Sequence, residues 1–409
     1  MPDVRSKVNG KMRPSDRDVV AVSAVRTPMG KFGGTFRDTP VYELGAAAIR
    51  ASIERAGLGP EEIDDVVLGC CRQAGNGTNP ARTAARLAGV PSHVPAATVT
   101  MACAAGTRAV VIASQTLRLC EARFVVAGGM ESMSTIPYLL KNARWSGFRH
   151  GNRILLDGWD DSRDPFVDHI GTGEVTENLV CKHRIGREEQ DRFAYESHMK
   201  AAEATRRGLF RDEIVPVTVR NSDDGPTTLD RDESIRCDTT LEKLARLPPC
   251  FRPGGTLTAG NSSGMTDGAS AMVLTTREIA RRRGLKPLFS VASYALAAVE
   301  NEWMGEGPSV GLPKALDKVR MSLADLDFIE VNEAFAGMVL ANERLLGWDR
   351  EKLNRHGGAI ALGHPVGCSG SRILVTLYYI LKSHDGETGA AAIGAAGGVT
   401  AAMLIRRES

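Results

Sequence analysis

The chain has 409 residues, 43% of them hydrophobic and 24% charged, and its formal net charge at pH 7 is +2. This length suffices for a large core divided between two or more packed units, and the nearly balanced charge argues against a surface that binds nucleic acid. No run of about 20 uninterrupted apolar residues is present, so the sequence predicts no transmembrane helix and no membrane partner.

Apolar runs and helical patterns alternate along the first third of the chain, after a polar leader. We expect the leader, residues 1–18, to be disordered. Short apolar and β-branched runs predict buried strands at 19–25, 66–69 and 124–127, the last ending at a pair of glycines. Helical patterns and capping residues predict helices at 41–57, at 80–89 and directly after Cys103. This alternation indicates an α/β sheet that is covered on both faces.

The middle of the chain has a different character. Residues 131–254 are polar, rich in Asp and Arg, and contain one long helical pattern at 188–207. Because they hold too little apolar material for an independent domain, we interpret them as a loop domain inserted into the first half of the chain. Strand–helix alternation resumes after residue 254.

The last third of the chain resembles the first. The small-residue turn and apolar helix at 104–113 have a counterpart at 368–377, and a strand with paired glycines follows each of them, at 128–129 and at 397–398. This order suggests two duplicated α/β halves. The starts of the two buried helices would then meet at the carboxyl ends of the strands, where open α/β sheets usually bind ligands.

Two residues at these helix starts have the chemistry of a nucleophile and its base. Cys103 falls where the first buried helix begins, and the amide groups and dipole of a helix start can stabilise a thiolate. His364 lies between a glycine and a proline at the mouth of the second helix. Taken alone, a cysteine such as Cys103 is more often a small buried hydrophobic residue, and His364 is more often a turn histidine. Paired by the duplication, they become candidates for nucleophilic catalysis.

The cysteine pattern limits the other chemistries. The chain has eight cysteines and no C-x-x-C pair. This disfavours both a disulfide framework and a structural zinc site, so we expect no metal and a reducing, cytoplasmic environment.

At this point the sequence resembles the thiolase family of acyl-CoA C-acyltransferases, from about Val19 to Arg407. The motifs that carry the resemblance are RTPMGKFGG, NPARTAA, VTMACAAGTRAV, VAGGMESMS, AGNSSGMTDGA, MGEGP, VNEAFA and GGAIALGHPVGCSG. It implies a thiolase fold, in which the two halves stack into a five-layered α-β-α-β-α core. The expected divisions are 1–18, an N-terminal half at 19–290 that includes the 131–254 loop domain, and a C-terminal half at 291–409.

The resemblance also implies roles for individual residues. Cys103 would take the acyl group from coenzyme A, and His364 would help to deprotonate it and donate to the thioester oxygen. Asn332 would hold a water that completes this first oxyanion site. The backbone amides of Cys103 and Ala396 would form the second oxyanion site, where each donor can lower the barrier by about 3 kcal/mol.

Positions that match the family's coenzyme A contacts can be carried over in the same way. They are His169, Arg236, Ser263, Met304 and Phe335. Without the resemblance, Arg236 would be interpreted equally well as a solvated charge, and Ser263 as part of a local turn. Coenzyme A enters as a substrate thioester, so no permanently bound cofactor is expected.

The chain departs from the family at one catalytic position. Thiolases that make or break carbon–carbon bonds usually carry a second cysteine in a C-x-G motif near the C-terminus, and here Gly394 takes its place and Ala396 that of the glycine. Glycine cannot exchange a proton, and loss of a positioned acid–base group costs about 10²–10⁴-fold in rate. Cys368 lies inside the following helix by pattern and is not expected to substitute for it.

Three functions are therefore weighed. The first is a thiolase that acts on acetyl-CoA or a short 3-oxoacyl-CoA through an acyl-Cys103 intermediate. The second is an atypical acyltransferase or condensing enzyme without normal thiolysis, and the third is a catalytically silent subunit that binds coenzyme A. The retained Cys103, Asn332 and His364 argue against the third function. The first is placed ahead of the second because the other matched segments are intact around the site. The resemblance also implies a homodimer or homotetramer, with part of the 131–168 segment at the tetramer contact.

Overall fold

The structure is a computed structural model, and it describes residues 7–8, 11–12, 15–148, 150–160, 163–221 and 225–408. The disorder expected for residues 1–18 falls largely on positions outside the described residues. Within that stretch, β1 (Lys7–Val8) and β2 (Lys11–Met12) pair as a short antiparallel ladder.

Two sets of strands repeat one pairing pattern, which confirms the duplication. In the first half the order is β3 (Val19–Arg26), β12 (Thr266–Thr276), β7 (Val125–Ser132), β5 (Asp65–Gly69) and β6 (Ala96–Val99). In the second half it is β13 (Phe289–Ala298), β16 (Val399–Arg407), β15 (Thr388–Gly394) and β14 (Phe328–Val331). In each half the first two pairings are antiparallel and the next is parallel. A parallel bridge from Ile329 to Leu353 occupies the place of β6 in the second half.

The two half-sheets are also joined to each other by hydrogen bonds. Phe289 and Ser290 of β13 pair with Ala21 and Val20 of β3. Together with β4 (Gly30–Lys31), which pairs with β12, the strands of the two halves therefore form one continuous ten-stranded sheet. The sequence predicted two halves, but it gave no sign of this edge-to-edge contact.

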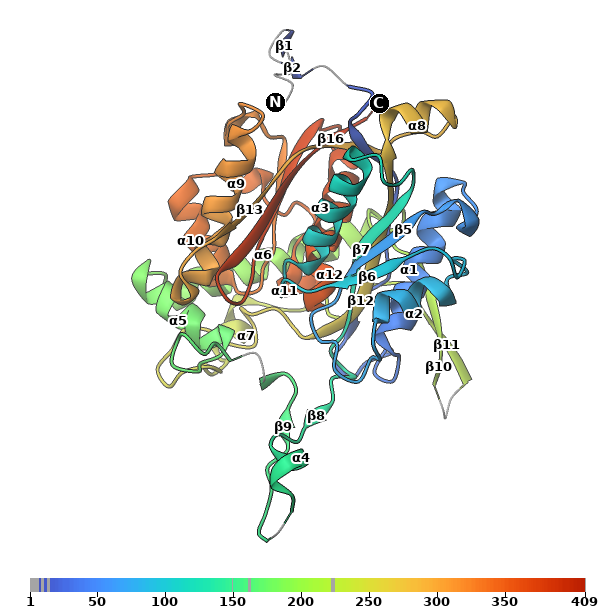
Figure 1. Cartoon of the computed structure of the whole chain (residues 1–409). Helices are drawn as coiled ribbons and strands as arrows, with labels where there is room; N and C mark the ends of the chain where they lie inside the picture. Colours follow the sequence, from blue (N-terminus) through green and yellow to red (C-terminus); the bar gives the residue numbers. More distant parts are fainter. Residues whose placement is uncertain are drawn as a thin grey trace.

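Helices cover the half-sheets on both sides and fill the space between them (Figure 1). One outer layer contains α1 (Val41–Ala56) and α2 (Pro80–Leu87), and the other contains α9 (Gly307–Asp317) and α10 (Ala336–Leu346). The central layer contains α3 (Ala105–Arg118) and α12 (Val366–Ser383), which pack against each other and against strands of their own halves. The five expected α-β-α-β-α layers are confirmed.

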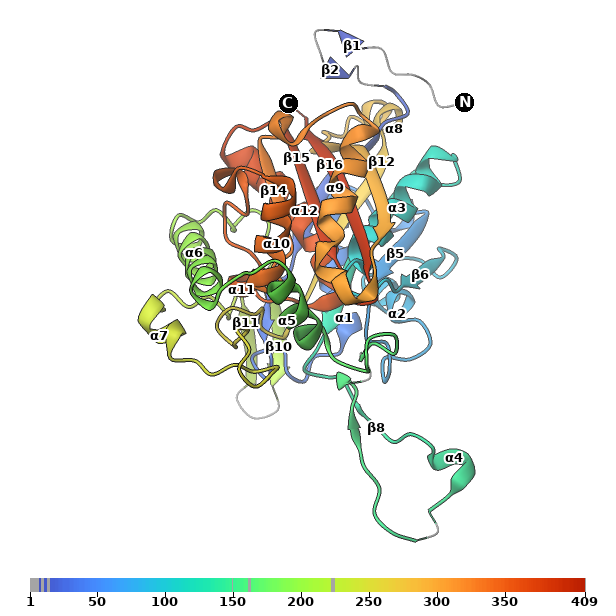
Figure 2. The ribbon, with the colours of Figure 1, turned by 90° about the vertical axis from the view of Figure 1, so that its left-hand side faces the viewer.

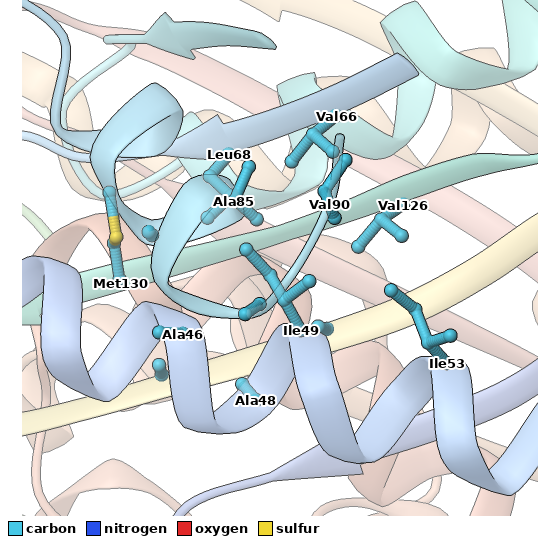
Figure 3. Packing of buried hydrophobic residues seen from close by; sticks show 14 of the residues in the cluster. Ala46, Ala48, Ile49, Ile53, Val66, Leu68, Ala85, Val90, Val126 and Met130 are labelled. Carbon is cyan, nitrogen blue, oxygen red and sulfur yellow. The ribbon is translucent and has the colours of Figure 1, made fainter. Parts of the chain in front are cut away.

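The apolar pattern of α1 shows how an outer layer is held in place. Figure 3 shows Ile49 and Ile53 of this helix directed at Val66 and Val126 of the sheet. The helix ends where predicted, because Gly57 adopts a left-handed backbone with φ of 69° that ordinary side chains disfavour. The spacing of apolar residues along α1 therefore determines which face of the helix packs on the first half-sheet.

The glycine pair at 128–129 corrects one expectation. It was predicted to end a strand, but β7 continues through it to Ser132. A β-carbon on Gly128 would lie 2.0 Å from the backbone oxygen of Ser270, and one on Gly129 would lie 2.2 Å from that of Gly367. These glycines therefore allow two other backbones to approach the strand closely. The pair at 397–398 lies in the turn between β15 and β16, with φ of 80° and 74°.

The insertion leaves the sheet after β7 and rejoins it at β12. It contains α5 (Thr172–Lys182), α6 (Arg187–Arg206), the hairpin of β10 (Val217–Asn221) and β11 (Gly225–Leu229), and α7 (Leu241–Ala245). Apolar residues of α5 and α6 share one cluster with α9, α10 and the second half-sheet. Helices α5 and α6 therefore pack on the C-terminal half, whereas Val217, Val219 and Leu229 of the β10–β11 hairpin belong to the apolar cluster of the first half.

Part of the insertion extends away from the body of the molecule as an arm (Figures 1 and 2). We define the arm as residues 136–148 and 150–158, which include β8 (Tyr138–Leu139), α4 (Ala143–Ser146) and β9 (Leu156–Asp157). Its large apolar side chains are exposed, with Trp145 at 92% and Ile154 at 78%. Among the described residues, no helix combines the length and hydropathy needed to cross a membrane.

Glycines let the two central helices approach each other closely. A β-carbon on Gly106 of α3 would lie 2.6 Å from the backbone nitrogen of Ser371, and one on Gly370 of α12 would lie 2.6 Å from Thr107 Oγ1. The Thr107 hydroxyl also donates a hydrogen bond to the Gly370 carbonyl at 2.8 Å. This contact fixes the start of α3, beside Cys103, against the start of α12, beside His364.

Candidate active site

A cavity of about 820 Å³ opens where the starts of α3 and α12 meet the turn after β15. Both halves of the chain contribute to its wall, as the duplication predicts, and most of the lining surface is apolar. The lining includes Cys71, Arg72, Cys103, Ser263, Met304, Phe335, His364, Gly394 and Ala396. Cys103 and His364, which are far apart in the sequence, therefore face one common space.

Cys103 is held in the turn that precedes α3. Ala102 adopts a left-handed backbone with φ of 46°, and the helix begins two residues after Cys103. Burial raises the pKa of the Cys103 thiol to about 11, although the backbone amides of Ala396 and of Cys103 itself donate hydrogen bonds to it and oppose the rise. The expected stabilisation of a thiolate by the helix start is thus outweighed by desolvation, so the resting residue is a neutral thiol.

His364 has a defined tautomer. Its Nδ1 lies 2.6 Å from Ser369 Oγ, and the Ser369 hydroxyl donates its own proton to the Pro365 carbonyl at 3.0 Å. Nδ1 must therefore carry the ring proton, which leaves Nε2 with a lone pair. Nε2 is buried and has no hydrogen-bond partner among the described residues. Burial, with a smaller contribution from the charge of Arg372, lowers the pKa of His364 to about 3, so the ring is neutral near pH 7.

Asn332 lies beside the main cavity and not in its wall. It lines a second space of about 10 Å³, which is room for a single water. Both the oxygen and the nitrogen of its side-chain amide are buried without a partner among the described residues. Ala334, Met338 and Gly394 line both spaces, so the amide of Asn332 lies next to the main cavity.

Gly394 leaves the cavity without an acid–base group at this point. It ends β15, and a β-carbon built there would lie 3.0 Å from the Met304 carbonyl oxygen and 3.3 Å from Pro308 Cδ. Cys368 lies in α12, where its sulfur is 3.4 Å from Ser270 Oγ, and it is not among the residues that line the cavity. It is not placed to supply the missing group.

The five candidate contacts with coenzyme A divide into two groups. Ser263, Met304 and Phe335 line the cavity, and the Ser263 hydroxyl donates to the Ala334 carbonyl at 3.0 Å. His169 and Arg236 are exposed and do not line it. The structure therefore brings three of these side chains to the cavity that holds Cys103.

Cys71, Arg72 and Glu131 were missed by sequence reasoning. Cys71 and Arg72 follow the carboxyl end of β5 and line the cavity. Buried Glu131 accepts hydrogen bonds from the backbone amides of Cys71, Arg72 and Gly367 at 2.9, 3.1 and 2.8 Å. One carboxylate thereby connects the loop after β5 to the start of α12. Cys71 and Arg72 directly follow the strand predicted at 66–69, and ligands in α/β sheets usually bind at the carboxyl ends of strands. This position is the sequence feature from which they could have been predicted.

Comparison with known proteins agrees with this architecture. The family model described as "Thiolase, N-terminal domain" matches residues 19–278, and "Thiolase, C-terminal domain" matches residues 285–407. The chain is 44% identical to acetyl-CoA acetyltransferase of Chromobacterium violaceum over 95% of its own length and 100% of that protein. It is 45% identical to the protein of the same name from Pseudomonas aeruginosa, covering 96% of this chain and 100% of that one.

Solved structures show the same relationship in three dimensions. The crystal structure of acetyl-CoA acetyltransferase from Bacillus anthracis superposes with a TM-score of 0.93 at 42% identity, over 96% of this chain and 99% of the other. Human mitochondrial 3-ketoacyl-CoA thiolase in complex with CoA gives 0.92 at 36% identity, over 96% and 99%. In sequence and in structure, from Val19 to Arg407, this chain belongs to the thiolase family of acyltransferases.

Proposed function

We propose that this protein is an acetyl-CoA C-acetyltransferase that carries the acyl group on Cys103. The observation that carries the proposal is the common cavity of Cys103 and His364. The Cys103 sulfur accepts hydrogen bonds from two backbone amides, and the Nε2 of His364 has no hydrogen-bond partner among the described residues. Relatives with this name cover nearly the whole chain. A cavity of about 820 Å³ is also large enough for the thioester end of coenzyme A.

The acylation step follows from the protonation states. At neutral pH both the Cys103 thiol and the His364 ring are uncharged, so the thiol gives its proton to His364 Nε2 as its sulfur attacks the thioester carbon. The bond from that carbon to the sulfur of coenzyme A then breaks, and the imidazolium returns the proton to the departing sulfur. One thioester is consumed and one is formed, so no other reactant is needed.

Backbone amides would stabilise the charge that develops on oxygen. The amides of Cys103 and Ala396 already converge on the Cys103 sulfur, so they are close to where the oxyanion of an acyl-Cys103 adduct would form. Asn332 has two unpaired amide atoms beside a space for one water, which fits a water-mediated contact with the first thioester oxygen. We assign Cys103, His364 and Asn332 as the catalytic side chains on this basis.

The carbon–carbon step has weaker support from this site. A base must remove a proton from the methyl group of a second acetyl-CoA, and Gly394 provides none. We therefore expect acylation of Cys103 to be fast relative to thiolysis of acetoacetyl-CoA.

Intact-mass spectrometry after incubation with acetyl-CoA tests the proposal directly. The wild type should gain the mass of one acetyl group, and Cys103→Ala should not. Cys71→Ala is the matched control because Cys71 is the other thiol in the cavity wall, and it should still be acetylated. Absence of the adduct in the wild type, or its persistence in Cys103→Ala, would refute the assignment.

The arm offers a route to self-association. We propose that two or four copies of the chain assemble and that the exposed apolar side chains of the arm contribute to the contact, because patches of this kind usually mark interaction sites. Light scattering of the wild type should give a mass above that of the monomer, and Trp145→Glu should lower it. A monomeric wild type would contradict this assignment.

A further inference from the structure

Arg72 is a cationic side chain that lines the cavity and lacks a counter-ion there. Its guanidinium lies over the Trp159 ring, 5.2 Å from the centroid, and Nη2 donates a long hydrogen bond of 3.4 Å to the Trp159 carbonyl. Its Nε is buried and has no partner, and the side chain forms no ion pair with any residue that the structure describes. A guanidinium has five N–H donors, so most of its donor capacity is unused.

The other charged groups in the cavity wall differ from Arg72 in this respect. Arg163 also lines the cavity, but it is paired with Glu174 at 3.2 Å and with Asp160 at 3.5 Å. Asp164 accepts a hydrogen bond from the Asn301 amide at 2.8 Å. Arg72 is therefore a cation of this wall without an ion pair among the described residues, while Asp164 contributes a negative charge to the same wall.

The loop after β5 fixes Arg72 relative to the nucleophile. Its backbone amide and that of Cys71 are both held by Glu131, whose carboxylate also binds the start of α12 beside His364. The charge of Arg72 reaches Cys103 as well, since it lowers the pKa of that thiol, although the opposing influence of Glu131 on the same thiol is larger. An acyl group bound to Cys103 would therefore lie within electrostatic reach of the guanidinium.

We propose that Arg72 binds an anionic group at the far end of the acyl chain, so that the protein accepts coenzyme A thioesters of short dicarboxylic acids. A planar guanidinium can hold a carboxylate through two parallel N–H···O bonds. A chain that ends in a methyl group would offer no acceptor to the guanidinium, so its unused donors would stay unpaired. This inference rests on the proposed function, because it assigns the acyl group that Cys103 carries.

Paired substrates and paired variants test the inference. Succinyl-CoA and butyryl-CoA have acyl chains of equal length, but only the first ends in a carboxylate. Acylation of Cys103, followed by intact mass, should be faster with succinyl-CoA, and Arg72→Gln should reduce this preference by about 10- to 100-fold. Arg163→Gln is the matched control, because Arg163 lines the same cavity but is already paired, and it should keep the preference.

Binding measurements separate this inference from the proposed function. Affinities of Cys103→Ala for the two thioesters, with and without Arg72→Gln, report on the acyl site even if acylation is not observed. We expect tighter binding of succinyl-CoA and loss of that difference in the double variant. Acetylation of Arg72→Gln by acetyl-CoA reports separately on the catalytic step, because loss of the Arg72 charge also removes an influence that lowers the pKa of the Cys103 thiol.

Two results would overturn the inference. One is an equal or greater preference for butyryl-CoA in both acylation and binding. The other is a loss of affinity for coenzyme A itself in Arg72→Gln that equals the loss for succinyl-CoA, because Arg72 would then bind phosphate groups of the carrier and not the acyl chain.

Discussion

Replacement of Gly106 by alanine should separate α3 and α12. The β-carbon would lie 2.6 Å from both the backbone nitrogen and Oγ of Ser371, and 3.1 Å from the Cys368 carbonyl oxygen. Restoring an ordinary contact of 3.4 Å moves α3 and α12 apart by about 0.8 Å, because the opposing nitrogen belongs to a helix backbone and cannot rotate away. The displaced segments carry Cys103 at the start of one helix and His364 at the start of the other.

The size of the effect follows from two opposing contributions. Overpacking in a buried contact costs about 1–3 kcal/mol, whereas alanine is preferred over glycine in a helix by up to about 1 kcal/mol. With a packing cost of about 3 kcal/mol and a helix-propensity gain of about 1 kcal/mol, the free energy of unfolding falls by about 2 kcal/mol. At about 2.1 cal/mol/K per residue, the 409 residues give an unfolding entropy of about 0.9 kcal/mol/K, so Tm should fall by about 2 °C.

Acylation should suffer more than stability does. A misplacement of about 1 Å between reacting groups can reduce a rate by about 10²-fold, so acetylation of Cys103 should slow by up to roughly 10²-fold at a temperature where Gly106→Ala is fully folded. Thermal unfolding by circular dichroism and time-resolved intact mass measure the two effects.

Gly186→Ala provides the matched control for this substitution. Gly186 precedes α6 with φ of −80°, and a β-carbon there has no atom within 4 Å. Its Tm and its acetylation rate should equal those of the wild type. If Gly106→Ala also left both quantities unchanged, the close helix contact would not position the site.

Three further predictions concern single groups of the site. The rate of Cys103 alkylation by iodoacetamide should rise about tenfold per pH unit from pH 7 to 10, because the pKa of the Cys103 thiol is raised to about 11 and the pKa of His364 is lowered to about 3. A rate that is already constant from about pH 6 upward would instead indicate a thiolate–imidazolium pair. Glu131→Gln should lower stability by about 1–3 kcal/mol, since an amide NH₂ would face a backbone N–H, and an unchanged urea midpoint would contradict the bridging role. Gly394→Cys should raise acetoacetyl-CoA thiolysis by about 10²–10⁴-fold if its β-carbon is accommodated 3.0 Å from the Met304 carbonyl, whereas an equal rate in a folded variant would mean that position 394 is not the missing acid–base site.

The sequence by itself determined the family, the duplication and the two residues that we propose react with the thioester. These features are local: Gly57 ends a helix where its left-handed backbone allows it, Asn79 caps another by accepting the Arg82 amide at 3.1 Å, and Cys103 and His364 each lie at a helix start. Patterns of this kind depend on near neighbours in the chain, so they can be recognised without knowledge of long-range contacts.

Tertiary structure decided what depends on distant neighbours. Burial, which no local pattern contains, turns Cys103 from an expected thiolate into a neutral thiol. Close approach of other backbones explains why β7 continues through Gly128 and Gly129. Arg72 follows a predicted strand, but only the meeting of the two halves places it in the wall of a cavity that also contains Cys103 and His364. Desolvation and steric fit are properties of the assembled core, so they became visible only once the halves were packed together.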